Sequence, residues 1–199
     1  MSSPGTGRAK IIRFPGPPRT PPLTRRQVRG LIAASNSNLE NALSRVADST
    51  AMRLSELGRI HSTDIDWKSE KIAVRMKAGE LGRFLDLDEE TGDAILKHLL
   101  SQRSRNGWLF ESENGEPLRP HEIAAILNRL AIRAGLGRIK RHALRRARAS
   151  YWLEQMDAPT VQQRLGIEYP SSRRYRRYTH LAWFKQVLWS SAFSPPPEE

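Results

Sequence analysis

Five residues that are far apart in the sequence are of the types that could act on a phosphate group. In chain order they are Arg53, Lys77, His142, Arg145 and Tyr178. Arginine forks neutralise the non-bridging oxygens of a phosphate, a phenol hydroxyl can serve as a nucleophile, and a lysine or histidine handles protons. The set predicts phosphoryl transfer that runs on cationic side chains and needs no cofactor.

Other kinds of chemistry are disfavoured by motifs that the sequence lacks. There is no GxxxxGK[ST] loop, no GxGxxG after a strand, no HExxH and no GxSxG elbow, and the five histidines are far apart. We therefore expect neither a metal site nor ATP-driven chemistry, although a Ser/His/Asp triad stays open. The absence of cysteine excludes a disulfide framework and a thiol nucleophile, and it favours a reducing compartment.

The chain is strongly basic. Its 199 residues hold 33 Lys plus Arg against 21 Asp plus Glu, a net charge of +12, and 26 of the 33 are arginine. Arginine favours planar, bidentate contact with phosphate, so the excess predicts a nucleic-acid partner rather than an evenly solvated surface. Besides Arg145, the candidate contacts bunch in two clusters: Arg138, Lys140, Arg141, Arg146 and Arg148, and then Arg173, Arg174, Arg176 and Arg177.

Local patterns place the candidate residues on helices and a hairpin. Residues 1–22 are rich in proline and basic, which predicts a flexible arm, and Thr24 with Gln27 has the spacing of a capping box at the start of the domain. A second helical stretch from Leu39 runs into the segment MRLSELGRI. Alternation in KIAVRM and RFLDL then predicts a β-hairpin with Lys77 at its bend.

Helical spacing returns after the hairpin and continues through most of the remaining chain. Predicted helices lie around Ile95, from Pro120 to Gly135, from near His142, and from Pro159 to Gly166. We expect one α+β, mainly α domain over 23–193 with a small antiparallel sheet, a final helix over 181–193 and a disordered tail over 194–199. No signal peptide or membrane span is predicted.

Taken with its neighbours, the candidate set resembles the catalytic domain of the tyrosine recombinases, the phage integrase family. The resemblance covers roughly residues 23–190. The matching phrases, in order, are Arg-x-Ser-Glu from Arg53 to Glu56, STDIDW from Ser62, the hairpin Lys77, LFESENGEPL from Leu109, His-x-x-Arg from His142 to Arg145, and Tyr-Thr-His from Tyr178. The expected fold is that domain's helical bundle with its small sheet.

This resemblance implies a mechanism for the five residues. Tyr178 would attack a phosphate of double-stranded DNA to give a 3′-phosphotyrosine, Arg53 and Arg145 would clamp the phosphate, and Lys77 would protonate the leaving 5′ oxygen. His142 would assist at the nucleophile, and Glu56 would orient Arg53 or a neighbouring cation. The resemblance also implies site-specific recombination by a homotetramer assembled on DNA. The gene would be bacterial or phage-encoded, and the protein would act in the bacterial cytoplasm, at the nucleoid.

Two departures from the family pattern leave alternatives open. The usual Leu-Gly-His phrase reads Leu165, Gly166, Ile167 here, and by distance from Tyr178 its slot falls on Tyr169. The usual N-terminal core-binding domain is expected to be lacking, so a protein partner could supply that clamp. A relative that binds DNA without cutting it, or a type IB topoisomerase-like enzyme, would fit the same residues.

Single residues also have structural interpretations. Arg53 could pair with Glu56 on a helix surface, Lys77 could be a solvated turn residue, and His142 could simply begin a helix. Tyr175 could replace Tyr178 as the nucleophile. Residues 181–193 could be core or could dock on a neighbouring protomer.

Overall fold

A computed structural model describes residues 21–75, 81–102 and 106–167. Its first helix, α1 (Arg25–Ala33), begins as the sequence predicts: the Thr24 hydroxyl accepts from the Gln27 amide, and the Gln27 side chain accepts in return from the Thr24 amide at 2.9 Å. Val28 and Leu31 on its inner face are fully buried.

Helix α2 (Asn38–Thr50) lies at the centre of the domain. It contacts α1, the short helix α3 (Leu54–Leu57) and three later helices, and its residues Leu43 and Val46 are fully buried. The expectation that this helix runs on into MRLSELGRI is wrong, because Ala51 adopts a left-handed backbone with φ of 51° and ends it. The chain turns there and starts α3 in a new direction, with Arg53 at its N-cap.

The predicted β-hairpin is confirmed and gains a third strand. A single 3₁₀ turn, η1 (Ser62–Asp64), leads into β1 (Ile65–Asp66), which pairs with β2 (Lys71–Arg75), and β2 pairs with β3 (Leu81–Asp86). Both pairings are antiparallel, with Ile72 opposite Leu85 and a register shift between Val74 and Arg75. The apolar residues Ile72, Val74 and Leu85 are buried, and Ala73 between the first two is buried as well.

Further helices follow the sheet in the part of the chain that the structure describes. They are α4 (Glu89–Ser101), α5 (Pro120–Arg133), α6 (Ala143–Trp152) and α7 (Ala158–Leu165). Pro120 opens α5 and Gly135, with φ of 73°, follows its end, as predicted. Helix α7 ends at Gly166, whose φ of 62° is the left-handed conformation that glycine adopts most readily.

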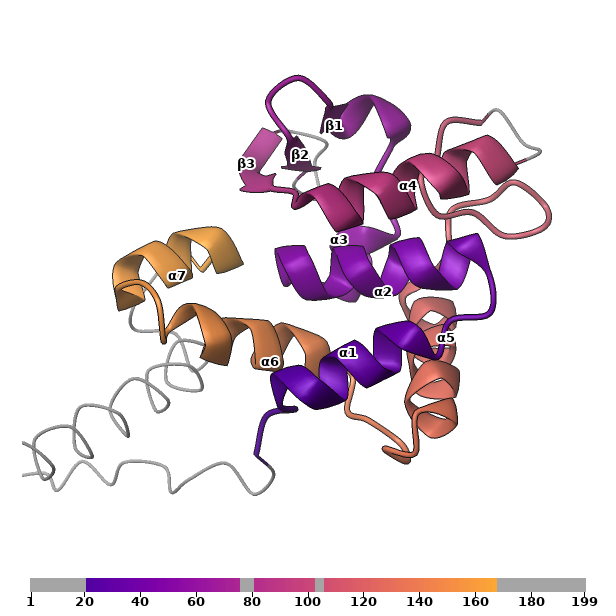
Figure 1. Ribbon diagram of the computed structural model, residues 1–199. Helices are drawn as coiled ribbons and strands as arrows, with labels where there is room; N and C mark the ends of the chain where they lie inside the picture. Colours follow the sequence, from indigo (N-terminus) through magenta and orange to yellow (C-terminus); the bar gives the residue numbers. More distant parts are fainter. Residues whose placement is uncertain (1–20, 76–80, 103–105, 168–199) are drawn as a thin grey trace, which may run out of the picture.

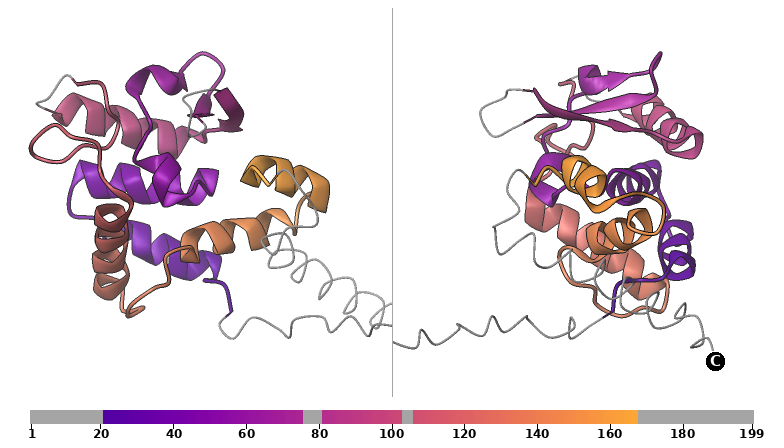
Figure 2. Two further views of the ribbon diagram at one scale, coloured as in Figure 1. Left: turned by 180° about the vertical axis from the view of Figure 1, so that it is seen from behind. Right: turned by 90° about the vertical axis from the view of Figure 1, so that its left-hand side faces the viewer.

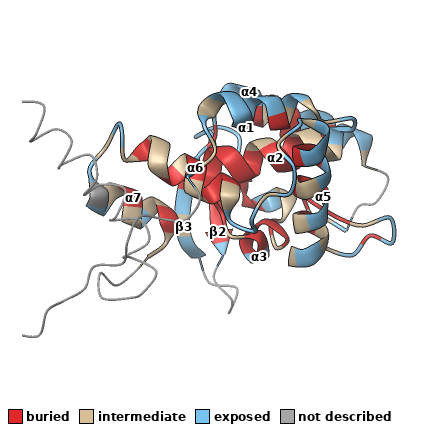
Figure 3. Cartoon of the chain, turned by 90° about the horizontal axis from the view of Figure 1, so that it is seen from below, coloured by how far each residue is buried: buried red, intermediate tan, exposed pale blue. Residues whose placement is uncertain are grey.

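The elements surround α2 in layers. In Figure 1 the sheet and α4 lie on one side of α2, and α1 and α6 lie on the other; Figure 2 shows the same order from behind and from the side. Figure 3 shows α2 as one of the most buried segments. Helix α7 contacts both α6 and β3, so it joins the helical layer to the sheet.

The fold class is therefore the predicted one, mainly helical with a small antiparallel sheet. Across the described segments, no helix has the length and apolar character needed to cross a membrane.

Candidate active site

Arg53 is fixed by the start of helix α3. Its backbone N–H donates to Glu56 Oε2 at 2.7 Å, and its Nη1 donates to Glu56 Oε1 at 2.6 Å. A carboxylate three residues into a helix satisfies an otherwise unpaired amide of the first turn. Because one carboxylate holds both the backbone and the guanidinium of Arg53, the side chain leaves the helix in a defined direction. Its Nη2 donates to the Gly166 carbonyl at 2.9 Å.

A second arginine, Arg83 on strand β3, shares the Glu56 carboxylate. Arg83 Nη1 lies 3.3 Å from Oε1 and Nη2 lies 3.1 Å from Oε2, while its Nε donates to the Arg164 carbonyl at 2.9 Å. The Glu56 side chain is only 7% exposed. Burial by itself raises the pKa of Glu56, but the hydrogen bonds and positive charge of Arg83 and then Arg53 outweigh it, so the pKa is lowered.

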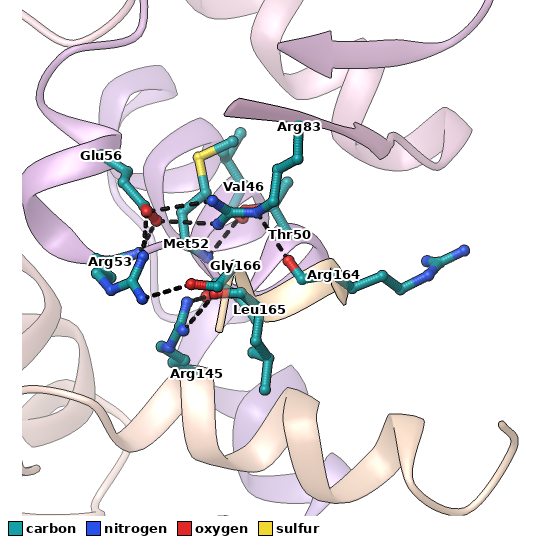
Figure 4. Close-up of polar contacts among 11 residues, drawn as sticks. Val46, Thr50, Met52, Arg53, Glu56, Arg83, Arg145, Arg164, Leu165 and Gly166 are labelled. Atoms are coloured by element: carbon teal, nitrogen blue, oxygen red, sulfur yellow. Dashed lines mark hydrogen bonds and ion pairs between the residues drawn. The ribbon is translucent and has the colours of Figure 1, made fainter. Parts of the chain in front are cut away.

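Arg145 reaches the same place from the first turn of α6. It is buried, with 5% of the residue exposed, and its Nη1 donates to the Ala51 carbonyl at 2.5 Å. Its Nη2 donates to the Leu165 carbonyl at 2.7 Å. Arg53 and Arg145 therefore meet at the consecutive carbonyls of Gly166 and Leu165, as Figure 4 shows.

The C-terminal end of α7 is a negative pole, and the side chains of these arginines donate hydrogen bonds to its carbonyls. The last carbonyls of a helix have no partner within it and carry a partial negative charge. A small apolar cluster fixes the helix in place, since Val161 and Leu165 of α7 pack with Trp152 and Ala149 of α6 and with Ala51. Arginines from α3, α6 and β3 thus converge on one helix end that is 20 to 113 residues away in sequence.

Gly166 is favoured over other residues at this point for two reasons. Its φ of 62° disfavours any side chain, and a Cβ placed there would lie 2.6 Å from Arg83 Nη1. The close approach of Arg83 to the backbone therefore depends on the glycine.

The next residue, Ile167, occupies the position at which the family phrase has histidine. Its side chain packs against the apolar cluster of α6 and α7.

His142 and most of the first basic cluster lie at the approach to α6. His142 is the N-cap residue of α6 and is exposed, three positions before Arg145. Arg138, Lys140 and Arg141 lie in the preceding loop and are exposed, whereas Arg146 lies within α6 and is partly buried. Lys140, Arg141, His142 and Arg145 contribute to one small pocket of about 20 Å³.

Arg148, which is also predicted to contact DNA, has its guanidinium in an ion pair within the domain. Its side chain is 12% exposed, and it donates from Nη2 to Asp48 Oδ2 at 2.7 Å and from Nε to the Asp48 carbonyl at 2.8 Å. Arg25 holds the other carboxylate oxygen at 2.8 Å. The guanidinium groups of Arg25 and Arg148 also lie over the Tyr151 ring, at 4.9 and 5.5 Å from its centre. These contacts tie α6 to α1 and α2.

Several predicted site residues fall outside the described residues: Lys77, Tyr169, Tyr175, Tyr178, Arg173, Arg174, Arg176 and Arg177. Residues 1–20 of the N-terminal arm, the segment 181–193 and the tail 194–199 fall outside as well. Within the described ranges, no group of three or more His, Cys, Asp or Glu side chains is arranged to hold a metal ion.

Arg83 is the site residue that reasoning from the sequence missed. A signal for it was present, because Arg83 alternates with Leu85 and Leu87 and therefore shares their inward face of the strand. A charged side chain on the buried face of a strand needs a partner of opposite charge. Glu56 is that partner.

Comparison with solved structures defines the class of fold. The crystal structure of XerA recombinase superimposes with a TM-score of 0.77 at 25% identity, over 91% of this chain and 67% of that one. XerH site-specific recombinase, solved in a post-cleavage complex with a palindromic difH substrate, superimposes with a TM-score of 0.71 at 21% identity, over 85% of this chain and 52% of that one. The domain therefore has the fold of a tyrosine recombinase catalytic domain.

The chain belongs to the phage integrase family, whose sequence model matches residues 22–183. It is 33% identical over 139 residues to tyrosine recombinase XerC of Staphylococcus saprophyticus, which is 67% of this chain and 46% of that protein. It is 28% identical over 188 residues to XerC of Chlamydia trachomatis, which is 87% of this chain and 59% of that protein. The chain thus spans about half the length of these relatives.

Proposed function

We propose that this chain is the catalytic part of a site-specific recombinase that cuts and rejoins double-stranded DNA through a phosphotyrosine. The observation that carries the proposal is the meeting of Arg53 and Arg145 at the end of α7, in a chain that belongs to the phage integrase family. Two guanidinium groups that already face a negative pole are suited to the non-bridging oxygens of a phosphate.

In this mechanism Tyr178 is the nucleophile. Its phenolic oxygen forms a bond to the scissile phosphorus, the bond from phosphorus to the 5′ oxygen breaks, and a 3′-phosphotyrosine and a free 5′-hydroxyl result. His142 assists at the nucleophile, and Lys77 gives a proton to the leaving 5′ oxygen. The two arginines stabilise the charge of the pentavalent transition state. Attack by a 5′-hydroxyl of another duplex reverses the step and exchanges strands, with no metal or ATP consumed.

The same proposal covers the partners. The XerH structure contains a difH substrate and a lambda integrase dimer was solved on a COC′ core site, which supports duplex DNA as the partner of this chain. Arg138, Lys140 and Arg141 lie in the loop before His142 and supply a phosphate-binding surface. Four such sites on two duplexes make a homotetramer on DNA. The bacterial relatives support action near a bacterial chromosome.

A covalent trap tests this function and does not require a defined DNA site. The protein is incubated with a pool of nicked duplexes of random sequence, denatured in SDS, and any peptide bound to DNA is mapped by mass spectrometry. A nick lets the cleaved fragment diffuse away, so the adduct accumulates. We expect the adduct at Tyr178, its loss in Tyr178→Phe, and its persistence in the control Tyr175→Phe.

Two outcomes would contradict the proposal. DNA binding by the wild type without any adduct would identify a protein that binds DNA and does not cut it. An adduct that survives in Tyr178→Phe and disappears in Tyr175→Phe would move the nucleophile to the neighbouring tyrosine.

A further inference from the structure

The Glu56 carboxylate has two cationic partners rather than one. Each of its oxygens accepts one hydrogen bond from Arg53 and one from Arg83, at distances from 2.6 to 3.3 Å. The exposed fractions are 7% for Glu56, 13% for Arg83 and 30% for Arg53. Arg83 is thus the more buried of the two arginines, and Arg53 keeps the solvent-facing side of the cluster.

This sharing determines the charge that the site presents. Arg53, Arg83 and Arg145 contribute three positive charges and Glu56 one negative charge, so the cluster keeps a net charge of about +2. Without Arg83, Glu56 would pair with Arg53 alone and the net charge would fall to about +1. A buried carboxylate that is neutralised by one arginine leaves the charge of the other to attract an anion.

Arg83 also fixes geometry. Its Nε donates to the Arg164 carbonyl in the last turn of α7, and its Nη1 lies 2.6 Å from the place that a Cβ on Gly166 would occupy. Since Arg53 donates to the Gly166 carbonyl, Arg83 touches both of the groups that orient Arg53: the Glu56 carboxylate and the end of α7.

We propose that Arg83 is a positioning residue of the active site, which binds Glu56 and the end of α7 so that Arg53 meets the phosphate with its charge and direction preserved. The proposal rests on the function proposed above. It assigns Arg83 no contact with DNA, so its effect passes through Glu56.

A purely structural role would make Arg83 a link between β3 and α7. The chain offers a matched control for that role in Arg164, whose Nη2 pairs with Asp86 of β3 at 2.8 Å across the same contact. Arg164→Gln removes one positive charge and one link between α7 and β3. It leaves both partners of Glu56 in place, so it separates the two roles.

The first arm of the test uses inorganic phosphate and needs neither a DNA site nor cleavage. Phosphate is titrated at constant ionic strength into ¹⁵N-labelled wild type, Arg83→Gln, Arg83→Lys and Arg164→Gln. The Nε–Hε signal of Arg53, assigned by its loss in Arg53→Lys, reports binding. We expect affinity to fall by about tenfold in Arg83→Gln, the order expected for one unit charge near a half-buried site, and to be nearly unchanged in Arg164→Gln. Arg83→Lys keeps the charge and should recover most of the loss.

The second arm measures adduct formation on a nicked duplex recovered from the random pool. In Arg83→Gln the rate of adduct formation should fall by at least about tenfold, while affinity for the duplex changes by less than about threefold, because the other phosphate contacts remain. In a Glu56→Gln background, Arg83→Gln should add little further loss, because residues that act through one another are not additive.

The outcomes separate the two proposals. If phosphate binding at Arg53 is the same in Arg83→Gln and Arg164→Gln, or if the wild type shows no phosphate response, Arg83 has no positioning role. The positioning role is also overturned if Arg83→Gln and Glu56→Gln reduce the rate of adduct formation independently, so that their effects multiply in the double variant. If phosphate binding responds as expected but no duplex yields an adduct, the role of Arg83 stands and the cleavage function fails.

Discussion

Glu56→Gln should destabilise the fold in a manner that depends on pH. Breaking a buried ion pair by removing one partner costs about 3–5 kcal/mol. Gln keeps one acceptor oxygen, and Arg53 is 30% exposed, so water recovers part of the loss. We therefore expect the free energy of unfolding to fall by about 2–3 kcal/mol at pH 7.

The pH dependence follows from the direction of the pKa shift. Burial raises the pKa of Glu56, but Arg83 and Arg53 outweigh it and lower the pKa below its ordinary value of 4.5. The native state therefore favours the ionised form, and its contribution is complete above pH 4.5 and is lost as the pH falls through the lower native value. The difference between wild type and Glu56→Gln should be constant near neutrality and should shrink below pH 4.5.

Urea denaturation followed by tryptophan fluorescence between about pH 3.5 and 8 measures this difference. The chain contains a matched control in Glu122, which accepts from the Arg119 backbone N–H at 2.6 Å at the start of α5, as Glu56 does at the start of α3. Glu122→Gln should cost only the capping contribution of about 1 kcal/mol. The reasoning is refuted if Glu56→Gln costs no more than this control, or if its cost does not change with pH.

Three further predictions concern the groups that support the site. Asp48→Asn should lower the free energy of unfolding by about 3 kcal/mol, because it leaves the largely buried Arg148 guanidinium without its carboxylate partner. Adding Arg148→Met should restore part of this stability, and thermal melting of both variants measures the difference. Gly166→Ala should lower the unfolding free energy by about 1–2 kcal/mol from its positive φ and should slow adduct formation by displacing Arg83; an unchanged rate would contradict the close approach described above. Burial lowers the pKa of His98 and outweighs the hydrogen bond to the Leu109 carbonyl and the charge of Glu111, which raise it. The free energy of unfolding should therefore decline as the pH falls below 6.5, and His98→Gln should flatten that decline. Equal slopes of unfolding free energy against pH in wild type and His98→Gln would disprove this prediction.

Much of the fold could be predicted because local signals agreed with the packed structure. Thr24 with Gln27, Pro120 with Gly135, and the stop at Gly166 each depend on a few neighbouring residues, and each is found where the sequence predicts it. The break at Ala51 was missed because alanine gives no local sign of a left-handed backbone. It is stabilised by a distant contact, the hydrogen bond from Arg145 to the Ala51 carbonyl.

The candidate site shows the same division. The types of Arg53 and Arg145 predicted a phosphate site, and the family resemblance implied that Glu56 orients Arg53; the structure brings these three residues to one place. Their distances from one another could not be predicted, because their meeting point consists of backbone carbonyls, which every residue carries. Arg83 was missed because only the apolar residues of β3 were used to assign the inward face of the strand.

Because the arginines meet at the end of α7, their cluster can form only late in synthesis of the chain. Arg53 and Glu56 leave the ribosome more than a hundred residues before the Gly166 carbonyl that orients Arg53. A nascent chain can form α1, α2 and the hairpin while its arginine cluster still lacks its negative pole. The arginine cluster is therefore among the last features of the described chain to form, because Gly166 lies near the end of the described residues.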